Sequence, residues 1–366
     1  MPKRIVIDAR ESGTSTGRYV DKLIEYLHKL QPAYEVIVLT KAPRIEFMKT
    51  TAPDFMVVES NYKEFTFAEQ VGFLRQLNGQ KADLVHFGMI QQPILYRGKA
   101  VTAILDLTTA RFRNPAKNWL VYWFKQQVYK WVIKRVARKS SRVITISNFI
   151  KKDVAQYAKI SPNKICVIYP AADKITVPAE PLVSLADKDF IMHVGRAQPH
   201  KNLKNLVEAF AKLKRSQPKL QLVFVGKIDD NYRLLQKYVK NRGVDDVVFT
   251  DFVSEGQLRW LYENARAYVF PSLSEGFGLP GLEALAHGLP LISSRATCLP
   301  EIYKDAAIYF DPKNTSDIAE KIKMVLDSPK IAHKMHEAGP MVATQYSWEK
   351  TAQQTLALYE QALESR

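Results

Sequence analysis

The sequence predicts an α/β protein made of two doubly wound, Rossmann-like domains that face a central cleft, each a parallel sheet covered by helices. Short apolar runs alternate with amphipathic helical patterns along most of the chain, which is typical of βαβ units. The alternation pauses over residues 171–188, a segment without clear periodicity that contains prolines, and then starts again. The length of 366 residues is also that of roughly two domains.

The first domain is expected over residues 1–170. Its first helix, residues 17–30, is amphipathic, with an apolar face formed by Val20, Leu23, Ile24, Leu27 and Leu30. Apolar runs predict strands at residues 4–9, 35–40, 55–59, 83–87, 101–105, 142–146 and 165–168. Further helices are predicted at residues 68–78, 117–139 and 148–158.

We expect residues 171–188 to be a linker and residues 189–345 to form the second domain. Its predicted strands are residues 190–194, 221–225, 247–249, 267–270, 290–293 and 307–309. Its predicted helices are residues 202–216, 231–241, 255–264, 280–287 and 316–326. Two final helices, residues 331–344 and 347–363, have no strand after them, so they cover a sheet face or return to the first domain.

The most informative motif is Ser-Glu-Gly-Phe-Gly-Leu-Pro-Gly-Leu-Glu-Ala at residues 274–284. It connects a predicted strand to a predicted helix, and open α/β sheets bind ligands at such junctions. The helix start offers unpaired N–H groups and the glycines allow close approach, which favours a diphosphate. Glu275 and Glu283 suit hydroxyl groups instead. A nucleotide sugar has both features, whereas a tight turn with an acidic helix start explains the motif without a ligand.

A second candidate segment, Gly195-Arg196-Ala197-Gln198-Pro199-His200-Lys201-Asn202, follows the first strand of the second domain. Arg196 and Lys201 would lie at the carboxyl edge of the same sheet. Their charges could neutralise a diphosphate and stabilise it as a leaving group. Each alone reads equally well as an ordinary surface cation, but two such loops in one sheet favour a shared site.

Charge is distributed unevenly along the chain, whose net charge is +16. Residues 1–180 hold 29 Lys and Arg against 15 Asp and Glu, so the first half carries most of the excess and predicts an anionic partner. No secretory signal or membrane-spanning run is apparent, which favours a cytoplasmic protein. Cys166 and Cys298 have no metal-site spacing and are expected to be reduced and buried.

Both motifs resemble the signatures of retaining glycosyltransferases of family 4, which have the GT-B fold. The resemblance extends over almost the whole length. It includes Phe-Ala-Glu-Gln at 67–70, Asp-Leu-Val-His-Phe at 83–87, Ile-Thr-Ile-Ser-Asn-Phe at 144–149, Val-Phe-Pro-Ser at 269–272 and Tyr-Ser-Trp-Glu-Lys at 346–350. Two glutamates separated by seven residues are its most specific element.

The resemblance implies a donor site and an activity: transfer of a hexosyl group from a GDP- or UDP-linked sugar, mannose slightly favoured, to a lipid-linked or glycan acceptor. Arg196 and Lys201 would hold the diphosphate, Glu275 the transferred sugar and Glu283 the ribose. Backbone amides would bind the sugar and the β-phosphate, and the nucleotide base would lie beside the loop after the strand at residues 247–249. The residues concerned are Phe277, Gly278 and Leu279 for the amides, Asp251, Phe252 and Val253 for the base, and Gly13 and Gly17 for an N-terminal loop over the diphosphate. Gly195 and Gly276 are also expected at the donor site.

The acceptor side departs from the family pattern. Many relatives carry a His-Asp pair where this chain has Leu105 and Asp106, and Leu105 cannot transfer a proton. Asp106 could orient the acceptor or a hydroxyl group of the donor sugar. His86 could line the acceptor pocket or be an ordinary core histidine. A front-face mechanism, in which the leaving phosphate deprotonates the acceptor, tolerates the loss of the histidine. The resemblance also implies that residues 346–366 form a helix that crosses back to the first domain.

No cluster of His, Asp or Glu has the spacing of a metal site, and we expect a metal-independent enzyme without a cofactor. The acid-free helix at residues 117–139 mixes aromatic and basic residues. Its predicted packing face is Val121, Phe124, Val128, Val132 and Val136, and its predicted membrane face is Trp119, Trp123, Lys130, Lys134 and Arg138.

Such a face predicts peripheral binding to the inner surface of the cell membrane. A solvated basic face is the alternative. Two rival functions are a nucleic-acid-binding protein, for which no signature is found, and a nucleotide-sugar epimerase of the same architecture.

Overall fold

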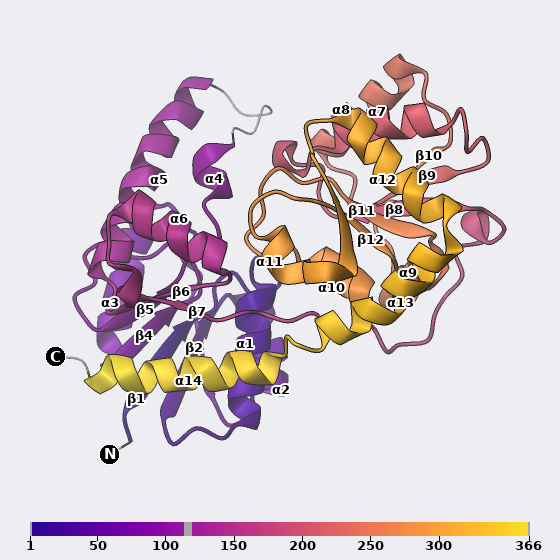
Figure 1. Ribbon diagram of the computed structural model, residues 1–366. Coiled ribbons are helices and arrows are strands. Elements are labelled where there is room, and N and C mark those ends of the chain that lie inside the picture. The colour runs from indigo at the N-terminus through magenta and orange to yellow at the C-terminus, as the bar shows by residue number, and fades with distance from the viewer. Residues whose placement is uncertain (1, 113–118, 365–366) are drawn as a thin grey trace. The chain divides into compact units, whose positions relative to one another are not determined.

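The chain divides into two compact units, which a computed structural model describes over residues 2–112 and 119–364, with only the backbone given for residues 119–122, 124 and 125 (Figure 1). The first unit comprises Met1–Ala110, Leu120–Pro170 and Ser347–Arg366, and the second comprises Arg111–Trp119 and Ala171–Tyr346. Each unit has its own sheet and its own core, as the two-domain sequence pattern predicts.

The sheet of the first unit is wholly parallel, with the strand order β3-β2-β1-β4-β5-β6-β7. Its central strands are buried on both faces and therefore consist of continuous apolar runs. The strands are β1 Arg4–Asp8, β2 Glu35–Thr40, β3 Met56–Glu59, β4 Leu84–Phe87, β5 Ala100–Ala103, β6 Arg142–Thr145 and β7 Ile165–Val167.

Helices lie between these strands as predicted, with two short additions. The helices α2 and α4 were not predicted, because each is too short to show a helical period. The predicted helix at residues 68–78 begins as a π-helical turn, Glu69–Phe73. The helices are α1 Arg18–Lys29, α2 Ile45–Thr51, α3 Leu74–Gly79, α4 Thr108–Arg111, α5 Trp119–Lys139, α6 Asn148–Ala158 and α14 Trp348–Glu364.

The last helix, α14, packs on the first unit against α1, β4 and β5 (Figure 1). Two hydrogen bonds fix it there: Thr351 Oγ1 donates to the Tyr169 carbonyl at 2.6 Å, and Lys99 Nζ donates to the Leu363 carbonyl at 2.7 Å. The described segments on either side of the second unit, β1 to β7 and α14, thus belong to the same unit.

The second unit repeats the architecture with the strand order β10-β9-β8-β11-β12-β13, again parallel throughout. Its strands are β8 Phe190–Val194, β9 Gln221–Val225, β10 Val247–Phe249, β11 Ala267–Phe270, β12 Leu291–Ser294 and β13 Ala307–Phe310. Its helices are α7 Leu203–Leu213, α8 Asp230–Arg242, α9 Glu255–Asn264, α10 Leu279–Ala286, α11 Leu299–Tyr303, α12 Thr315–Asp327 and α13 Pro329–Ala343.

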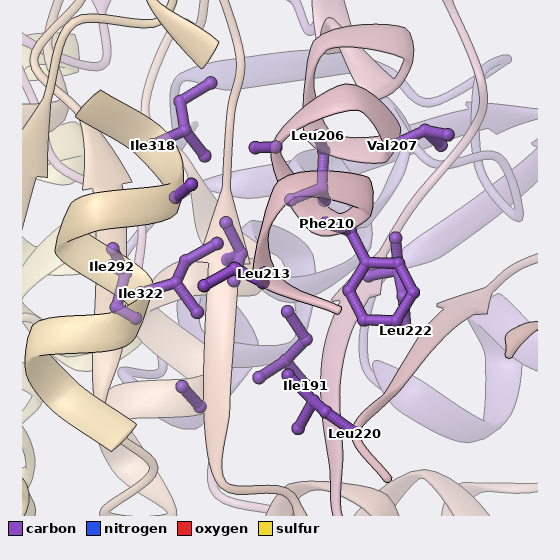
Figure 2. Close-up of a cluster of buried hydrophobic side chains, with 14 of the residues drawn as sticks. Ile191, Leu206, Val207, Phe210, Leu213, Leu220, Leu222, Ile292, Ile318 and Ile322 are labelled. Atoms are coloured by element: carbon purple, nitrogen blue, oxygen red, sulfur yellow. The ribbon is translucent and has the colours of Figure 1, made fainter. Parts of the chain in front are cut away.

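The core of the second unit lies between its sheet and the helices α7 and α12, which pack against each other. Figure 2 shows Leu206 and Phe210 of α7 together with Ile318 and Ile322 of α12. All four side chains are fully buried. This packed layer holds the sheet and therefore the loops that leave its carboxyl edge.

Two sequence-based expectations were wrong in detail. Of the predicted stripe on α5, Val136 is buried and Val132 is partly buried, but Val128 is 44% exposed, and Tyr129, Ile133 and Ala137 form the rest of the buried face. The side chains of Val121 and Phe124 lie outside the described residues. The large apolar side chains of Tyr129 and Ile133 pack into the core and determine which face of the helix is buried. Of the two free cysteines, Cys298 is buried, but Cys166 lies only half-buried on the edge strand β7.

Candidate functional site

Two candidate loops leave neighbouring strands at the point where the strand order of the second sheet reverses. β8 and β11 pair directly, although Val194 and Ala267 are 73 positions apart in the chain, and each strand is followed by one of the two sequence motifs. In doubly wound sheets the carboxyl edge at this reversal is the ligand-binding position. The topology therefore brings both motifs to one place.

The backbones of the two loops are hydrogen-bonded to each other. The Leu273 amide donates to the His200 carbonyl at 2.7 Å, and Asn202 Nδ2 donates to the Pro271 carbonyl at 3.0 Å. Asn202 has a φ of 60°, a left-handed conformation that asparagine tolerates better than most residues. These contacts hold the two loops in a fixed relative position.

Lys201 and Glu275 form an ion pair across the two loops. Lys201 Nζ lies 2.6 Å from Glu275 Oε1, and both side chains are largely buried. Burial alone would raise the pKa of Glu275, but the charge and the hydrogen bond of Lys201, together with smaller contributions from neighbouring groups, outweigh burial and hold this pKa below that of an ordinary glutamate. Glu275 is therefore a carboxylate at neutral pH, an acceptor for hydroxyl groups.

Three residues that the sequence analysis missed support the Glu275 loop. The Glu275 amide donates to Thr297 Oγ1 at 3.1 Å, and Cys298 Sγ donates to the Glu275 carbonyl at 3.3 Å. The buried Tyr303 hydroxyl donates to the Gly278 carbonyl at 2.6 Å. All three residues follow β12, and in this region the sequence pattern predicted only the strand.

Glycines in the motif are required by packing within the protein. A Cβ at Gly278 or Gly281 would lie 2.2 or 2.3 Å from the Tyr303 hydroxyl, and Gly278 has a φ of 96°. We expected these glycines to let a ligand approach the backbone closely, but at these two positions the side chain of Tyr303 occupies that space. Gly278 is also the N-cap of α10, and it provides no side-chain hydrogen bond to cap this helix.

Glu283 lies one turn into α10 and is 8% exposed. Its Oε2 accepts a hydrogen bond from the Tyr262 hydroxyl at 3.1 Å. A carboxylate has several lone pairs and can accept more than one hydrogen bond. Phe277 is buried, and its ring contacts that of Tyr346.

Arg196 is exposed and, within the part of the chain that the structure describes, forms no ion pair. It follows Gly195, whose φ is 147°. The preceding His193 is fully buried: its Nδ1 donates to the Val269 carbonyl at 3.0 Å, and burial lowers its pKa to about 4. Arg196 thus follows a fixed strand end and a glycine whose conformation other residues rarely adopt.

The segment Asp251–Val253 adjoins the same edge. The Asp251 carboxylate accepts from the Ile228 amide at 2.8 Å, and its carbonyl accepts from the Gly226 amide at 3.3 Å. Gly226 in turn has no room for a side chain, because a Cβ would lie 2.4 Å from the Gly195 carbonyl oxygen. Phe252 is 82% exposed.

In the first unit the predicted residues follow β1, β4 and β5. Gly13 has a φ of 77° and its amide donates to Asp21 at 3.1 Å. Gly17 is required by packing, since a Cβ there would lie 1.8 Å from the Glu11 carbonyl oxygen. Leu105 and Asp106 are half-buried, and Asp106 accepts a hydrogen bond from the Thr108 amide at 2.8 Å.

His86 is fully buried in the core of the first unit. Its Nδ1 lies 2.5 Å from the Tyr359 hydroxyl of α14, and burial lowers its pKa to about 3. This environment is that of a core histidine, the second of the two alternatives left open by the sequence.

A buried ion-pair network at the end of β1 escaped the sequence analysis. Arg10 is fully buried between Asp8 at 2.8 Å and Glu69 at 3.0 Å, and its guanidinium lies 3.8 Å from the centre of the Phe73 ring. Glu69 is 59 positions from Arg10 in the chain, so nothing in the sequence indicated this contact. The network ties β1 to the π-helical turn before α3.

The basic helix α5 turns part of its predicted membrane face outward. Trp123 is 58% exposed and Arg138 is exposed, whereas Lys130 and Lys134 are half-buried. The side chain of Trp119 lies outside the described residues. None of the helices that the structure describes has both the length and the hydropathy needed to cross a bilayer. Residues 2–112 and 119–364 bring no three His, Cys, Asp or Glu side chains together for a metal ion.

Known proteins share both halves of the sequence and the fold. Residues 16–174 match the model of Glycosyltransferase Family 4, and residues 179–341 match that of Glycosyl transferases group 1. An MMP α-(1→4)-mannosyltransferase of Mycolicibacterium hassiacum is 31% identical over 66% of this chain and 60% of its own length. O-antigen chain mannosyltransferase B of Escherichia coli is 28% identical over 59% and 60%, so this chain spans about 60% of these relatives.

Among solved structures, Anabaena HepE in complex with UDP and glucose superposes with a TM-score of 0.78 at 16% identity, covering 99% of this chain and 100% of that one. At this identity the likeness shows the fold alone. Two family models that cover almost the whole chain, the two parallel sheets and this superposition agree. The chain belongs to the group 1 glycosyl transferases, family 4, and has the GT-B fold.

Proposed function

We propose that the protein is a retaining glycosyltransferase that moves a hexosyl group from a nucleotide-diphosphate sugar to a lipid-linked or glycan acceptor in cell-envelope glycoconjugate synthesis. The observation that carries this proposal is the ion pair between Lys201 and Glu275, at the strand-order reversal of the second sheet. A cation and an ionised carboxylate side by side suit a ligand that has both phosphates and hydroxyl groups.

The donor diphosphate is proposed to lie between Arg196, Lys201 and the start of α10. An ammonium group has three N–H donors, so Lys201 can keep its contact with Glu275 and still bind a phosphate oxygen. The uncapped helix start, with the backbone of Gly276, Phe277, Gly278 and Leu279, adds amide donors and the positive end of a dipole. Gly13 and Gly17 are proposed to close over the diphosphate from the first unit.

The two glutamates are proposed to bind the sugars of the donor. Glu275 accepts from hydroxyl groups of the transferred hexose, and Glu283 accepts from the ribose while keeping its bond to Tyr262. The base is proposed to lie beside Asp251, Phe252 and Val253, where the exposed Phe252 ring offers a stacking surface.

In the proposed reaction the bond between the hexose C1 and the β-phosphate oxygen breaks while the acceptor oxygen bonds to C1 on the same face. The acceptor proton passes to the leaving phosphate. Arg196 and Lys201 stabilise the negative charge that develops on the diphosphate, the main electrostatic demand of the reaction. Asp106 is proposed to orient the acceptor, and Leu105 in place of a histidine is compatible because the phosphate takes the proton.

Mannose is the favoured hexose, because the relatives named above are mannosyltransferases. A UDP-linked donor is the next candidate, as HepE was crystallised with UDP and glucose. Because one of those relatives is named as an O-antigen chain mannosyltransferase, the acceptor is proposed to be lipid-linked or a glycan, reached at the inner face of the cell membrane.

A thermal-shift screen of UDP, GDP, ADP and their sugars tests donor binding, since a selective ligand raises the unfolding temperature. Incubating the stabilising sugar nucleotide with and without acceptor then tests the reaction. We expect a glycoside whose anomeric configuration, read by NMR, is that of the donor. An isomeric sugar nucleotide formed without acceptor would instead identify an epimerase and contradict the proposal.

A further inference from the structure

The first unit has a hollow of about 630 Å³ on its surface that the proposed reaction does not use. Five cations line it: Arg97, Lys134, Arg135, Arg138 and Lys139. The rest of the lining is apolar, and no acidic residue takes part. A hollow with this composition is complementary to an anion that carries an apolar group.

The sequence of α5 determines which face borders the hollow. Trp131, Lys134, Arg135 and Arg138 are spaced i, i+3, i+4 and i+7, so they share one face of the helix. The buried residues, which include Ile133 and Ala137, occupy the opposite face. The same packing that holds α5 on the sheet therefore presents the cations together.

Their positive charge is not neutralised within the described part of the chain. None of the five forms an ion pair with a described carboxylate; Lys139 Nζ instead donates to the Ile94 carbonyl at 3.2 Å, and Arg138 Nε donates to the Ala158 carbonyl at 2.8 Å. Partial burial and the repulsion of Arg135 and Arg97 lower the pKa of Lys139. An anion in the hollow would remove this repulsion.

The hollow lies at the opposite edge of the sheet from the residues proposed to act in catalysis. Arg97 lies three positions before β5 and Lys139 three positions before β6, so both lie near the amino ends of parallel strands. Gly13 and Asp106 follow β1 and β5, at the carboxyl ends. The hollow is thus a separate place in the first unit.

We propose that this hollow binds the phosphate headgroup of an anionic lipid in a bilayer. Leu95 and Trp131 border it and are 61% and 51% exposed, so an apolar and an amphipathic side chain stand beside the cations. Tryptophan favours the headgroup region of membranes, where its ring is partly apolar and its N–H finds polar partners. A free phosphate ester would leave these two side chains in water. Arg97, Arg135 and Lys139 lie outside the membrane face predicted from the sequence.

Vesicle flotation with two matched double variants tests the proposal. Arg97→Gln/Arg135→Gln removes two exposed cations from the hollow, and Lys63→Gln/Arg75→Gln removes two exposed cations elsewhere in the first unit that form no ion pair with a described carboxylate. On vesicles of phosphatidylcholine and phosphatidylglycerol, the first variant should lower the partition coefficient about fivefold per arginine, roughly 30-fold in total. The second should lower it less than about twofold. Equal losses would show diffuse charge attraction and overturn the proposal.

Three further measurements complete the test. Leu95→Ser/Trp131→Ser, which keeps all five cations, should also weaken vesicle binding severalfold; unchanged binding would contradict insertion into the interface.

Glycerol phosphate should not raise the unfolding temperature of the chain. Stabilisation by glycerol phosphate without vesicle binding would identify a soluble ligand instead. If Arg97→Gln/Arg135→Gln lost binding to duplex DNA but kept binding to vesicles, the hollow would be a nucleic-acid site and the proposal would be overturned.

The inference does not depend on glycosyl transfer. Donor hydrolysis should be unchanged in Arg97→Gln/Arg135→Gln, and Glu275→Gln should still float with the vesicles. Failure of one claim is therefore distinguishable from failure of the other.

Discussion

Lys201 Nζ lies 2.6 Å from Glu275 Oε1, and this contact joins two loops that are 74 residues apart in the chain. The pair is largely buried at the carboxyl edge of the second sheet. The attraction keeps Glu275 ionised despite its burial, with its pKa below the ordinary value. The two sequence motifs thus form one structural unit, to which the proposed donor site is assigned.

Arg196→Ala should weaken donor binding without affecting the fold. Arg196 is exposed and unpaired among the described residues, so its removal should change the free energy of unfolding by less than about 0.5 kcal/mol. The loss of a charge-assisted hydrogen bond to the diphosphate should weaken donor binding about 10- to 100-fold in calorimetry. Arg215→Ala, an exposed cation in the same unit, is the control and should change neither quantity.

Arg10→Met should destabilise the first unit strongly. It would leave the buried carboxylates of Asp8 and Glu69 without their cation. Breaking a buried pair in this way costs about 3–5 kcal/mol. Urea unfolding measures the loss. Arg75→Met, at an exposed position, should cost less than about 0.5 kcal/mol, and an equal loss in both variants would refute the role of the network.

Gly281→Ala should disturb α10 and donor binding together. Its Cβ would lie 2.3 Å from the hydroxyl of the fully buried Tyr303, so the helix start or Tyr303 must move. Overpacking of this kind costs about 1–3 kcal/mol. Gly79→Ala, where a Cβ meets nothing within 4 Å, is the matched control. Unfolding curves and donor titrations that agree for both variants would contradict the packing argument.

Stability should fall as the pH drops below 6.5. Burial lowers the pKa of His86 to about 3 and of His193 to about 4, so the unfolded chain binds protons below pH 6.5 that the folded chain does not. Their contribution is complete above pH 6.5 and is lost toward pH 4, by about 1.4 kcal/mol per pH unit for each histidine. His86→Asn should reduce this slope by one proton; an unchanged slope in urea titrations would contradict it.

The sequence predicted the architecture well because regular α/β units leave strong local signals. β8, β9, β10, β11 and α9 have the predicted bounds, since buried parallel strands are continuous apolar runs and α9 begins with a Ser254 capping box. The two motifs were predicted to share a sheet edge, and the structure places them on neighbouring strands.

The supporting contacts could not be predicted, because each joins residues that are distant in sequence and ordinary in type. Tyr303 reads as a core aromatic until its hydroxyl is found against Gly278. Thr297 precedes the short helix α11, which has no period to detect. The buried face of α5 could not be fully predicted, because apolar valines and aromatic residues lie on two different faces of the helix and either face could pack on the sheet.

The most direct test of the account is the single-turnover transfer rate of Glu275→Gln, measured together with its donor affinity. The substitution keeps the shape of the side chain but removes the negative charge beside Lys201. We expect transfer to fall about 100- to 1000-fold, with the donor dissociation constant changed only severalfold. Glu320→Gln, an exposed glutamate of the same unit, should behave as wild type. Undiminished transfer by Glu275→Gln would contradict the central claim.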